Sequence, residues 1–243
     1  MHKSISIVLS GEAGQGLQVV EEFLVETLAR ETYVFTSKEV MSRVRGGNNS
    51  VEIRISAQPI DALRYTIDAL LLFNNHSLDR LRPRLTPDSI IYGEAGFISD
   101  EDQRHLTFRE IPFSEMAKQS GNRLYINTVM FGFIAGMLDI DVENAKDQIK
   151  IRFKKLDEEI VLGNLKAFDL GYTAGDSEPK KTLREKPVDF TPHKVFNGNN
   201  ALVIGALAGG VNYLAAYPMS PGTSVMSMLS EKSHTYGVLV EQA

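Results

Sequence analysis

The sequence predicts an α/β protein built on a three-layer domain with a largely parallel sheet. Two observations carry this prediction. Short β-branched apolar runs alternate with segments of helical periodicity, and the first run ends in a glycine-rich turn that opens a helix. The composition agrees, because 43% of the 243 residues are apolar and 23% are charged, as in globular chains with a sizeable core.

The elements of this domain are expected in a regular order. A buried strand over 5–9 precedes a helix over 17–28, whose apolar residues recur at spacings of three and four. Alternation of apolar and polar residues over 51–56 predicts a half-exposed strand. The remaining expected elements are central strands over 69–73 and 89–92, an apolar helix over 127–138, and one or two amphipathic helices over 143–168.

Composition divides the chain into three zones. The first domain is expected over 1–175, and residues 176–195, rich in charge and proline, are typical of a linker. Residues 196–243 begin a second α/β domain that stops after about 45 residues. A piece of this size buries only part of its apolar surface alone, so we expect the domain to be truncated. Its expected elements are a helix over 201–210, a strand over 213–217, a helix from 225 and a strand over 238–240.

Charge and cysteine content exclude several functions. The net charge is −5, which disfavours a nucleic-acid binder that needs a basic surface. The chain has no cysteine, so it holds no disulfide, thiolate nucleophile or cysteine-ligated iron–sulfur cluster. Its histidines lack metal-ligand spacing and no run of about 18 apolar residues occurs. We expect a cytoplasmic protein with no metal site and no membrane or nucleic-acid partner.

The first candidate site is the glycine turn from Gly11 to Gly16, which follows a strand and opens a helix. Glycines let a ligand approach the backbone, and a helix N-terminus attracts anions. Gly14, Gln15 and Gly16 are therefore candidate ligands of a phosphate or carboxylate. The G-x-x-G-x-G spacing differs from the G-x-G-x-x-G of dinucleotide-binding turns. The alternative is a tight turn that only packs strand against helix.

The second candidate site is the segment Ser42–Asn49. In an extended backbone Arg43 and Arg45 point the same way, and Gly46 and Gly47 free the backbone beside them. Two guanidinium groups so placed can hold a phosphate or a carboxylate. The alternative is a solvated hairpin turn that carries incidental charge.

The third candidate site lies where a predicted strand of the second domain meets a helix. Pro218 and Pro221 fix the backbone on either side of Ser220, so that its hydroxyl is held in one direction. Ligands of open α/β sheets bind at the carboxyl ends of strands. The alternative is a strand end followed by a helix cap at Thr223 or Ser224.

Together these motifs resemble the 2-oxoacid:ferredoxin (acceptor) oxidoreductases, in particular subunits that fuse a gamma domain to the front of an alpha domain. The departures are Glu12 and Ala13 within the glycine turn, and Ser220 where the family has threonine. The family's glutamate-bearing stretch is not reached by residue 243. The matching segments are Gly11–Gly16, Ser42–Asn49, Asn127–Gly132, Asn200–Gly209 and Tyr217–Thr223.

The resemblance implies an enzyme that oxidatively decarboxylates a 2-oxoacid (2-oxoglutarate, pyruvate or a branched-chain acid) to an acyl-coenzyme A and CO₂. Thiamine diphosphate with magnesium and iron–sulfur clusters serve this reaction, and ferredoxin takes the electrons. The resemblance places those cofactors on a beta subunit within a hetero-oligomer. This chain holds none of them and is expected to be inactive alone.

The resemblance also implies roles for individual residues. Ser220 would be the catalytic residue, whose hydroxyl forms a hydrogen bond with the substrate or its thiamine adduct. Two alternatives stay open: a non-catalytic module for subunit contacts, and a stand-alone nucleotide-binding oxidoreductase, which the absence of an acidic residue at 36–38 disfavours. The substrate residues implied are Tyr217, Pro218, Ser220 and Pro221, and the coenzyme A or anion residues are Gly14, Gln15, Gly16, Arg43, Arg45, Gly46 and Gly47.

Overall fold

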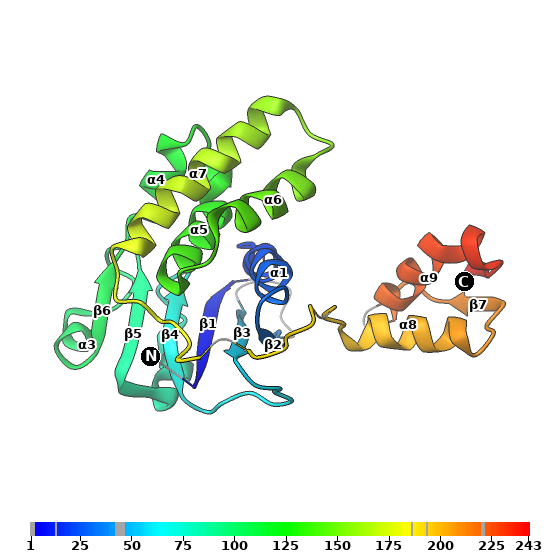
Figure 1. Cartoon of the computed structure of the whole chain (residues 1–243), viewed down its shortest axis with the longest axis horizontal. Helices are drawn as coiled ribbons and strands as arrows, with labels where there is room; N and C mark the ends of the chain where they lie inside the picture. The colour runs from blue at the N-terminus through cyan, green and yellow to red at the C-terminus, as the bar shows by residue number, and fades with distance from the viewer. Residues whose placement is uncertain (1–2, 13, 42–46, 186, 193, 220–221) are drawn as a thin grey trace. The chain divides into compact units, whose positions relative to one another are not determined.

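The chain folds into two compact units, Met1–His193 and Lys194–Ala243, each described here by itself. The structure is a computed structural model (Figure 1). It describes residues 3–12, 14–41, 47–185, 187–192, 194–219 and 222–243.

A six-stranded sheet in the order β2-β3-β1-β4-β5-β6 forms the centre of the first unit. Strands β1, β4, β5 and β6 are parallel, so the predicted α/β fold with a largely parallel sheet is confirmed. Strand β3 pairs antiparallel with both β1 and β2. Its pairing with β2 is antiparallel because the connection from Glu39 to Asn48 is too short for the crossover that a parallel pair needs. The strands are β1 (Ser4–Glu12), β2 (Tyr33–Glu39), β3 (Asn48–Ser56), β4 (Ile67–Leu72), β5 (Leu85–Gly93) and β6 (Thr107–Glu110).

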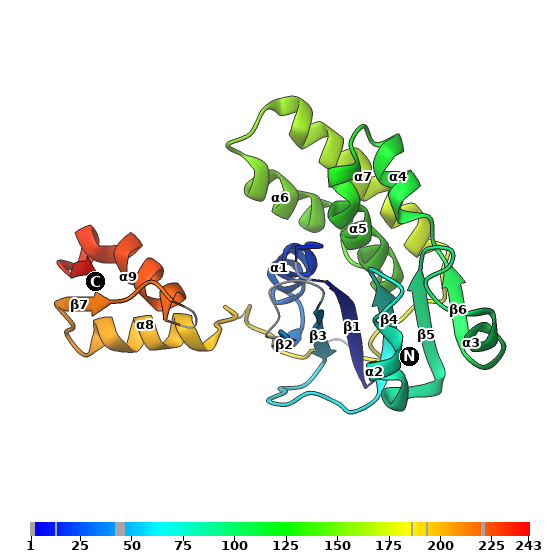
Figure 2. The ribbon, with the colours of Figure 1, turned by 180° about the vertical axis from the view of Figure 1, so that it is seen from behind.

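Helices cover both faces of this sheet. The larger group of helices covers one face of the sheet, over the main apolar core, as both views show (Figures 1 and 2). Short helices pack on the opposite face around Val8 and Leu70. The first group contains α1 (Leu17–Leu28), α4 (Phe113–Gln119), α5 (Ile126–Leu138), α6 (Val142–Phe153) and α7 (Glu158–Asp176), with the 3₁₀ turn η2 (Arg123–Tyr125). The second contains α2 (Leu78–Leu81) and α3 (Asp100–His105), with the 3₁₀ turn η1 (Arg82–Arg84).

Helices α5 and α7 pack so closely that glycines line their contact. A Cβ on Gly171 would lie 2.0 Å from the carbonyl oxygen of Val129, and one on Gly132 would lie 2.2 Å from that of Phe168. Gly136 and Gly175 are equally confined by backbone atoms of the facing helix. This contact fixes the position of α5, and therefore of the polar residues at its N-terminus.

Strand β3 is not half-exposed as predicted. Its polar face is covered, and Glu52 is only 5% exposed. The Glu52 carboxylate accepts a hydrogen bond from the Ser6 hydroxyl at 3.0 Å and pairs with Arg84 at 2.6 Å. A buried carboxylate is tolerated only when it is paired in this way, so alternation along β3 marks two buried faces of different polarity.

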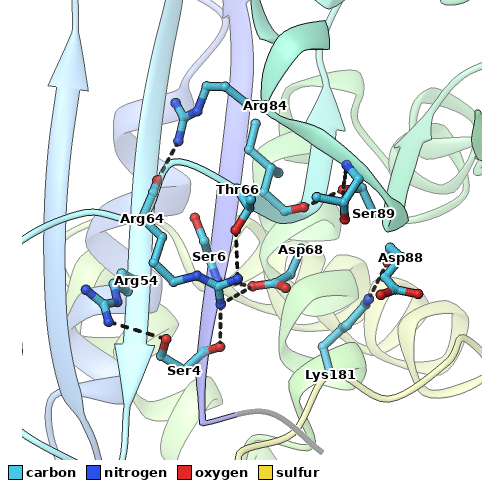
Figure 3. Close-up of polar contacts among 12 residues, drawn as sticks. Ser4, Ser6, Arg54, Arg64, Thr66, Asp68, Arg84, Asp88, Ser89 and Lys181 are labelled. Atoms are coloured by element: carbon cyan, nitrogen blue, oxygen red, sulfur yellow. Dashed lines mark hydrogen bonds and ion pairs between the residues drawn. The ribbon is translucent and has the colours of Figure 1, made fainter.

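A polar network joins the amino ends of the parallel strands (Figure 3). Arg64 donates to the Ser4 carbonyl at 2.9 Å and to the Asp68 carboxylate at 3.1 Å. The buried Ser89 hydroxyl donates to the Ile67 carbonyl at 2.6 Å. Burial lowers the pKa of Lys181, whose ammonium reaches the Asp88 carbonyl at 3.3 Å. These contacts tie the chain together at the sheet end opposite the glycine turn.

The second unit is a small α/β piece. Strands β7 (Tyr213–Ala216) and β8 (Leu239–Gln242) are parallel, and helices α8 (Gly198–Ala208) and α9 (Thr223–Tyr236) pack together. Many of its apolar side chains are exposed, among them Leu202 and Tyr236. In the part of the chain that the structure describes, no helix combines the length and apolar character needed to span a bilayer.

Candidate functional site

Four segments of the first unit meet where β1 ends: the glycine turn, the start of β3, the loop after β4 and the start of α5. In the antiparallel register Gly11 lies opposite Asn49 and Glu12 opposite Asn48. On the other side of β1, the amide of Phe73 donates to the Ser10 carbonyl at 2.8 Å as β4 ends. The structure therefore places the glycine turn directly beside Asn48 and Asn49, the end of the arginine-bearing segment, although the sequence presents the two as separate motifs.

The glycine turn is closed by one side chain. The Gln15 carboxamide oxygen accepts from the Glu12 amide at 2.6 Å, and its Nε2 donates to the Phe73 carbonyl at 3.2 Å. Gly14 has φ 89°, in the left-handed region that favours glycine, and no atom of the described residues lies within 4 Å of the position that its Cβ would occupy. The backbone at Gly14 is therefore open to a ligand.

The next glycine faces a polar side chain instead. Gly16 has φ 81°, and a Cβ there would lie 1.9 Å from Nδ2 of Asn127, at the start of α5. The Oδ1 atom of Asn127 is buried and has no hydrogen-bond partner among the described residues. Gly16 thus allows Asn127 to approach the turn, where its oxygen can accept a hydrogen bond.

Gly16 is also the N-cap of α1, and no side-chain cap bond is made there. The first turn of α1 has no acidic residue. Its backbone N–H groups and the positive end of its dipole therefore suit a phosphate or a carboxylate. The carboxamides around the turn do not titrate, so this arrangement suits ligand binding rather than proton transfer. Among the described residues, no group of three or more His, Asp or Glu side chains is placed to hold a metal.

The predicted site residues fall into two groups. Gly14, Gln15 and Gly16 form the turn, and the buried Gly47 immediately precedes β3. Tyr217 and Pro218 follow β7 in the second unit, and Tyr217 is largely exposed. Arg43, Arg45, Gly46, Ser220 and Pro221 lie outside the described residues.

Sequence reasoning missed the loop after β4. Asn74 and Ser77 are buried in this loop, beneath the glycine turn and the start of β3. The available signal was the polar run from Asn74 to Ser77 directly after an apolar strand. Since the carboxyl ends of parallel strands meet at one edge of a sheet, this run belongs beside the glycine turn.

Fold and site together define an α/β domain whose candidate site is a glycine turn at the N-terminus of a helix, without a thiol or metal centre among the described residues. The match to known families narrows this class. The chain belongs to the pyruvate ferredoxin/flavodoxin oxidoreductase family, which matches residues 6–174.

Two curated relatives are similar to this chain. Ketoisovalerate oxidoreductase subunit VorA of Methanothermobacter marburgensis is 25% identical over 173 residues, covering 70% of this chain and 36% of the relative. The alpha subunit of 2-oxoacid:ferredoxin oxidoreductase 1 of Aeropyrum pernix is 22% identical over 95% of this chain and 44% of the relative. The chain thus spans less than half the length of these relatives.

Solved structures show the same fold. A 2-oxoglutarate:ferredoxin oxidoreductase of Magnetococcus marinus, with 2-oxoglutarate, coenzyme A and succinyl-CoA bound, matches the whole chain and 44% of its own, with TM-score 0.87 and 24% identity. Pyruvate oxidoreductase subunit PORC of Thermotoga maritima matches 71% of this chain and 97% of its own, with TM-score 0.58 and 23% identity.

Proposed function

We propose that this chain is part of a 2-oxoacid:ferredoxin oxidoreductase and that its first unit binds coenzyme A at the glycine turn. The observation that carries the proposal is the open backbone at Gly14 beside the uncapped N-terminus of α1. Coenzyme A brings phosphates, which suit such a terminus. Family membership and the coenzyme A bound in the Magnetococcus enzyme support the choice of ligand.

In the proposed reaction, a 2-oxoacid and coenzyme A yield an acyl-coenzyme A and CO₂, and two electrons pass to ferredoxin. Iron–sulfur clusters do not fit this chain, because it contains no cysteine. We therefore assign the clusters, together with thiamine diphosphate and magnesium, to a beta subunit, and expect no turnover from this chain alone. The 2-oxoacid is 2-oxoglutarate, pyruvate or a branched-chain acid. A cytoplasmic location completes the proposal.

Each half of the chain has a separate proposed task. In the first unit, Gly14, Gln15 and Gly16 form the turn that receives the phosphates, with the Gln15 amide donating to the Glu12 carbonyl at 3.2 Å to hold its shape. Arg43 and Arg45 supply positive charge, and Gly46 and Gly47 leave the backbone beside them accessible. In the second unit, Ser220 donates a hydrogen bond to the substrate or its thiamine adduct. Tyr217, Pro218 and Pro221 border that site.

The test of coenzyme A binding uses the complete complex with Arg45→Ala. A lost hydrogen bond to a charged group costs about 1.5–3 kcal/mol, so the dissociation constant for coenzyme A should rise roughly 10- to 150-fold. Arg30→Ala is the matched control, because Arg30 is an exposed arginine that contacts Asn144 at the far end of α1. Equal affinities for Arg45→Ala and the control would refute the contact.

A second candidate function is a subunit-contact module. Val40, next to the arginine-bearing segment, is 70% exposed, and Leu124, shortly before Asn127, is 80% exposed. These two exposed apolar side chains, in segments that adjoin the candidate site along the chain, offer contact surface to a protein partner. Sedimentation velocity separates the two functions: Arg45→Ala would weaken assembly if the motif binds a subunit, and would leave assembly intact if it binds coenzyme A.

A further inference from the structure

The loop after β4 lies between the two halves of the candidate binding site. Asn74 is 9% exposed and Ser77 only 1% exposed. On one side of this loop is Gln15 of the glycine turn, and on the other is Asn48, the first residue of β3. Neither Asn74 nor Ser77 is needed by the sheet ladder, whose pairing between β1 and β4 ends at Ser10 and Leu72.

Asn74 connects the loop to the glycine turn. Its Nδ2 donates to Oε1 of Gln15 at 3.4 Å, the same oxygen that accepts the Glu12 amide. Its Oδ1 accepts from the His76 amide at 3.0 Å and from the Ser77 hydroxyl at 2.8 Å. The carboxamide thus uses both ends, one toward the turn and one toward its own loop.

Ser77 connects the loop to β3. Its hydroxyl oxygen lies 3.0 Å from Oδ1 of Asn48, and Nδ2 of Asn48 donates to the His76 carbonyl. Two oxygens, on Asn74 and Asn48, therefore lie within reach of one hydroxyl hydrogen. A buried hydroxyl shared in this way favours one spacing between its two neighbours, because each bond restricts the other.

We propose that Ser77 and Asn74 are positioning residues, which set the distance between the glycine turn and the start of β3 for ligand binding. The proposal rests on the proposed function, since it takes coenzyme A as the ligand of the turn. Neither residue touches the ligand. Both act through Gln15 and Asn48, whose backbones carry the turn and the end of the arginine-bearing segment.

The test compares Ser77→Ala with Ser89→Ala in the complete complex. Ser89 is the matched control, because its hydroxyl is buried and bonded to a carbonyl at the opposite end of the sheet (Figure 3). Both variants lose one buried hydroxyl and should melt at similarly lowered temperatures. Only Ser77→Ala should raise the KM and dissociation constant for coenzyme A, by roughly three- to tenfold as expected for one hydrogen bond. The KM for the 2-oxoacid should stay unchanged.

Hydrogen exchange gives a readout that a merely structural role would not move. Ser77→Ala should speed exchange of the Glu12 amide, which bonds to Gln15, while Ser89→Ala should not. Gln15→Ala separates the two proposals. Weaker coenzyme A binding in Gln15→Ala with unchanged binding in Ser77→Ala overturns the positioning role and leaves the proposed function standing. Unchanged binding in both variants overturns the proposed function and the positioning role with it.

Discussion

The pair of variants Gly16→Ala and Gly14→Ala tests how the glycine turn is built. Both glycines have positive φ, and an L-residue in the left-handed region costs about 1–2 kcal/mol. Alanine regains about 0.4–1 kcal/mol by restricting the unfolded chain. For Gly14 we expect no further cost, since none of the residues that the structure describes has an atom within 4 Å of the added methyl group. The expected net loss for Gly14→Ala is therefore about 1 kcal/mol.

Gly16→Ala should cost more, because the added methyl group overlaps the Asn127 carboxamide, 1.9 Å from its Nδ2 and 2.6 Å from its Cγ. Overpacking of this kind costs about 1–3 kcal/mol. The expected total for Gly16→Ala is about 2–4 kcal/mol. Urea denaturation of the 243-residue chain, followed by circular dichroism, measures the difference between the two variants.

A double-mutant cycle identifies the cause of that difference. In an Asn127→Ala background the overlap is gone, so Gly16→Ala should cost about as much as Gly14→Ala. The reasoning is refuted if Gly16→Ala costs no more than Gly14→Ala in the wild-type background. It is equally refuted if removing Asn127 leaves the extra cost in place.

Two further predictions concern stability. Gly171→Ala should lower the free energy of unfolding by at least about 2 kcal/mol, since its methyl group would meet the Val129 carbonyl. Gly205→Ala, at a helical position with space for a methyl group, should be neutral or stabilising by up to about 1 kcal/mol. Equal effects of the two substitutions in urea denaturation would contradict the close contact between α5 and α7. Burial raises the pKa of Tyr92, whose hydroxyl has no partner among the described residues, so stability should fall as pH rises above about 10, where the unfolded tyrosine ionises. Tyr92→Phe should be more stable by about 1 kcal/mol at pH 7 and lack this alkaline loss; a pH-dependence that is identical in both proteins would contradict the burial argument.

Local pattern was enough to predict most elements. The helix over 17–28 was predicted with its observed bounds, because its apolar spacing and the preceding glycine are both local signals. The region 143–168 holds two helices, α6 and α7, of which the second runs on to Asp176. A hairpin was only the alternative interpretation of residues 42–49, and the antiparallel pairing of β2 with β3 was not worked out, since strand pairing depends on contacts distant in sequence.

Burial was harder to predict than secondary structure. Alternation over 51–56 suggested a solvent face, yet Glu52 is buried against Ser6 and Arg84. The partner that neutralises Glu52 is 32 residues away in the chain. No local pattern indicates such a pairing, which depends on where η1 packs.

The candidate site shows the same division. The glycine turn was recognised from its spacing, but its neighbours Asn127 and Ser77 come from segments that pack beside it only in the folded chain. The β1–β3 register places Asn48 opposite Glu12 and so unites two motifs that the sequence separates. Local sequence thus indicated the backbone of the candidate site, and tertiary packing supplied the side chains around it.

Hydrogen exchange of the complete complex, with and without coenzyme A, tests ligand binding at the turn most directly. We expect coenzyme A to slow hydrogen exchange of the backbone amides from Gly14 to Val19, and NAD to leave their exchange unchanged. Unaltered exchange in this segment at saturating coenzyme A, or equal protection by NAD, would contradict this expectation.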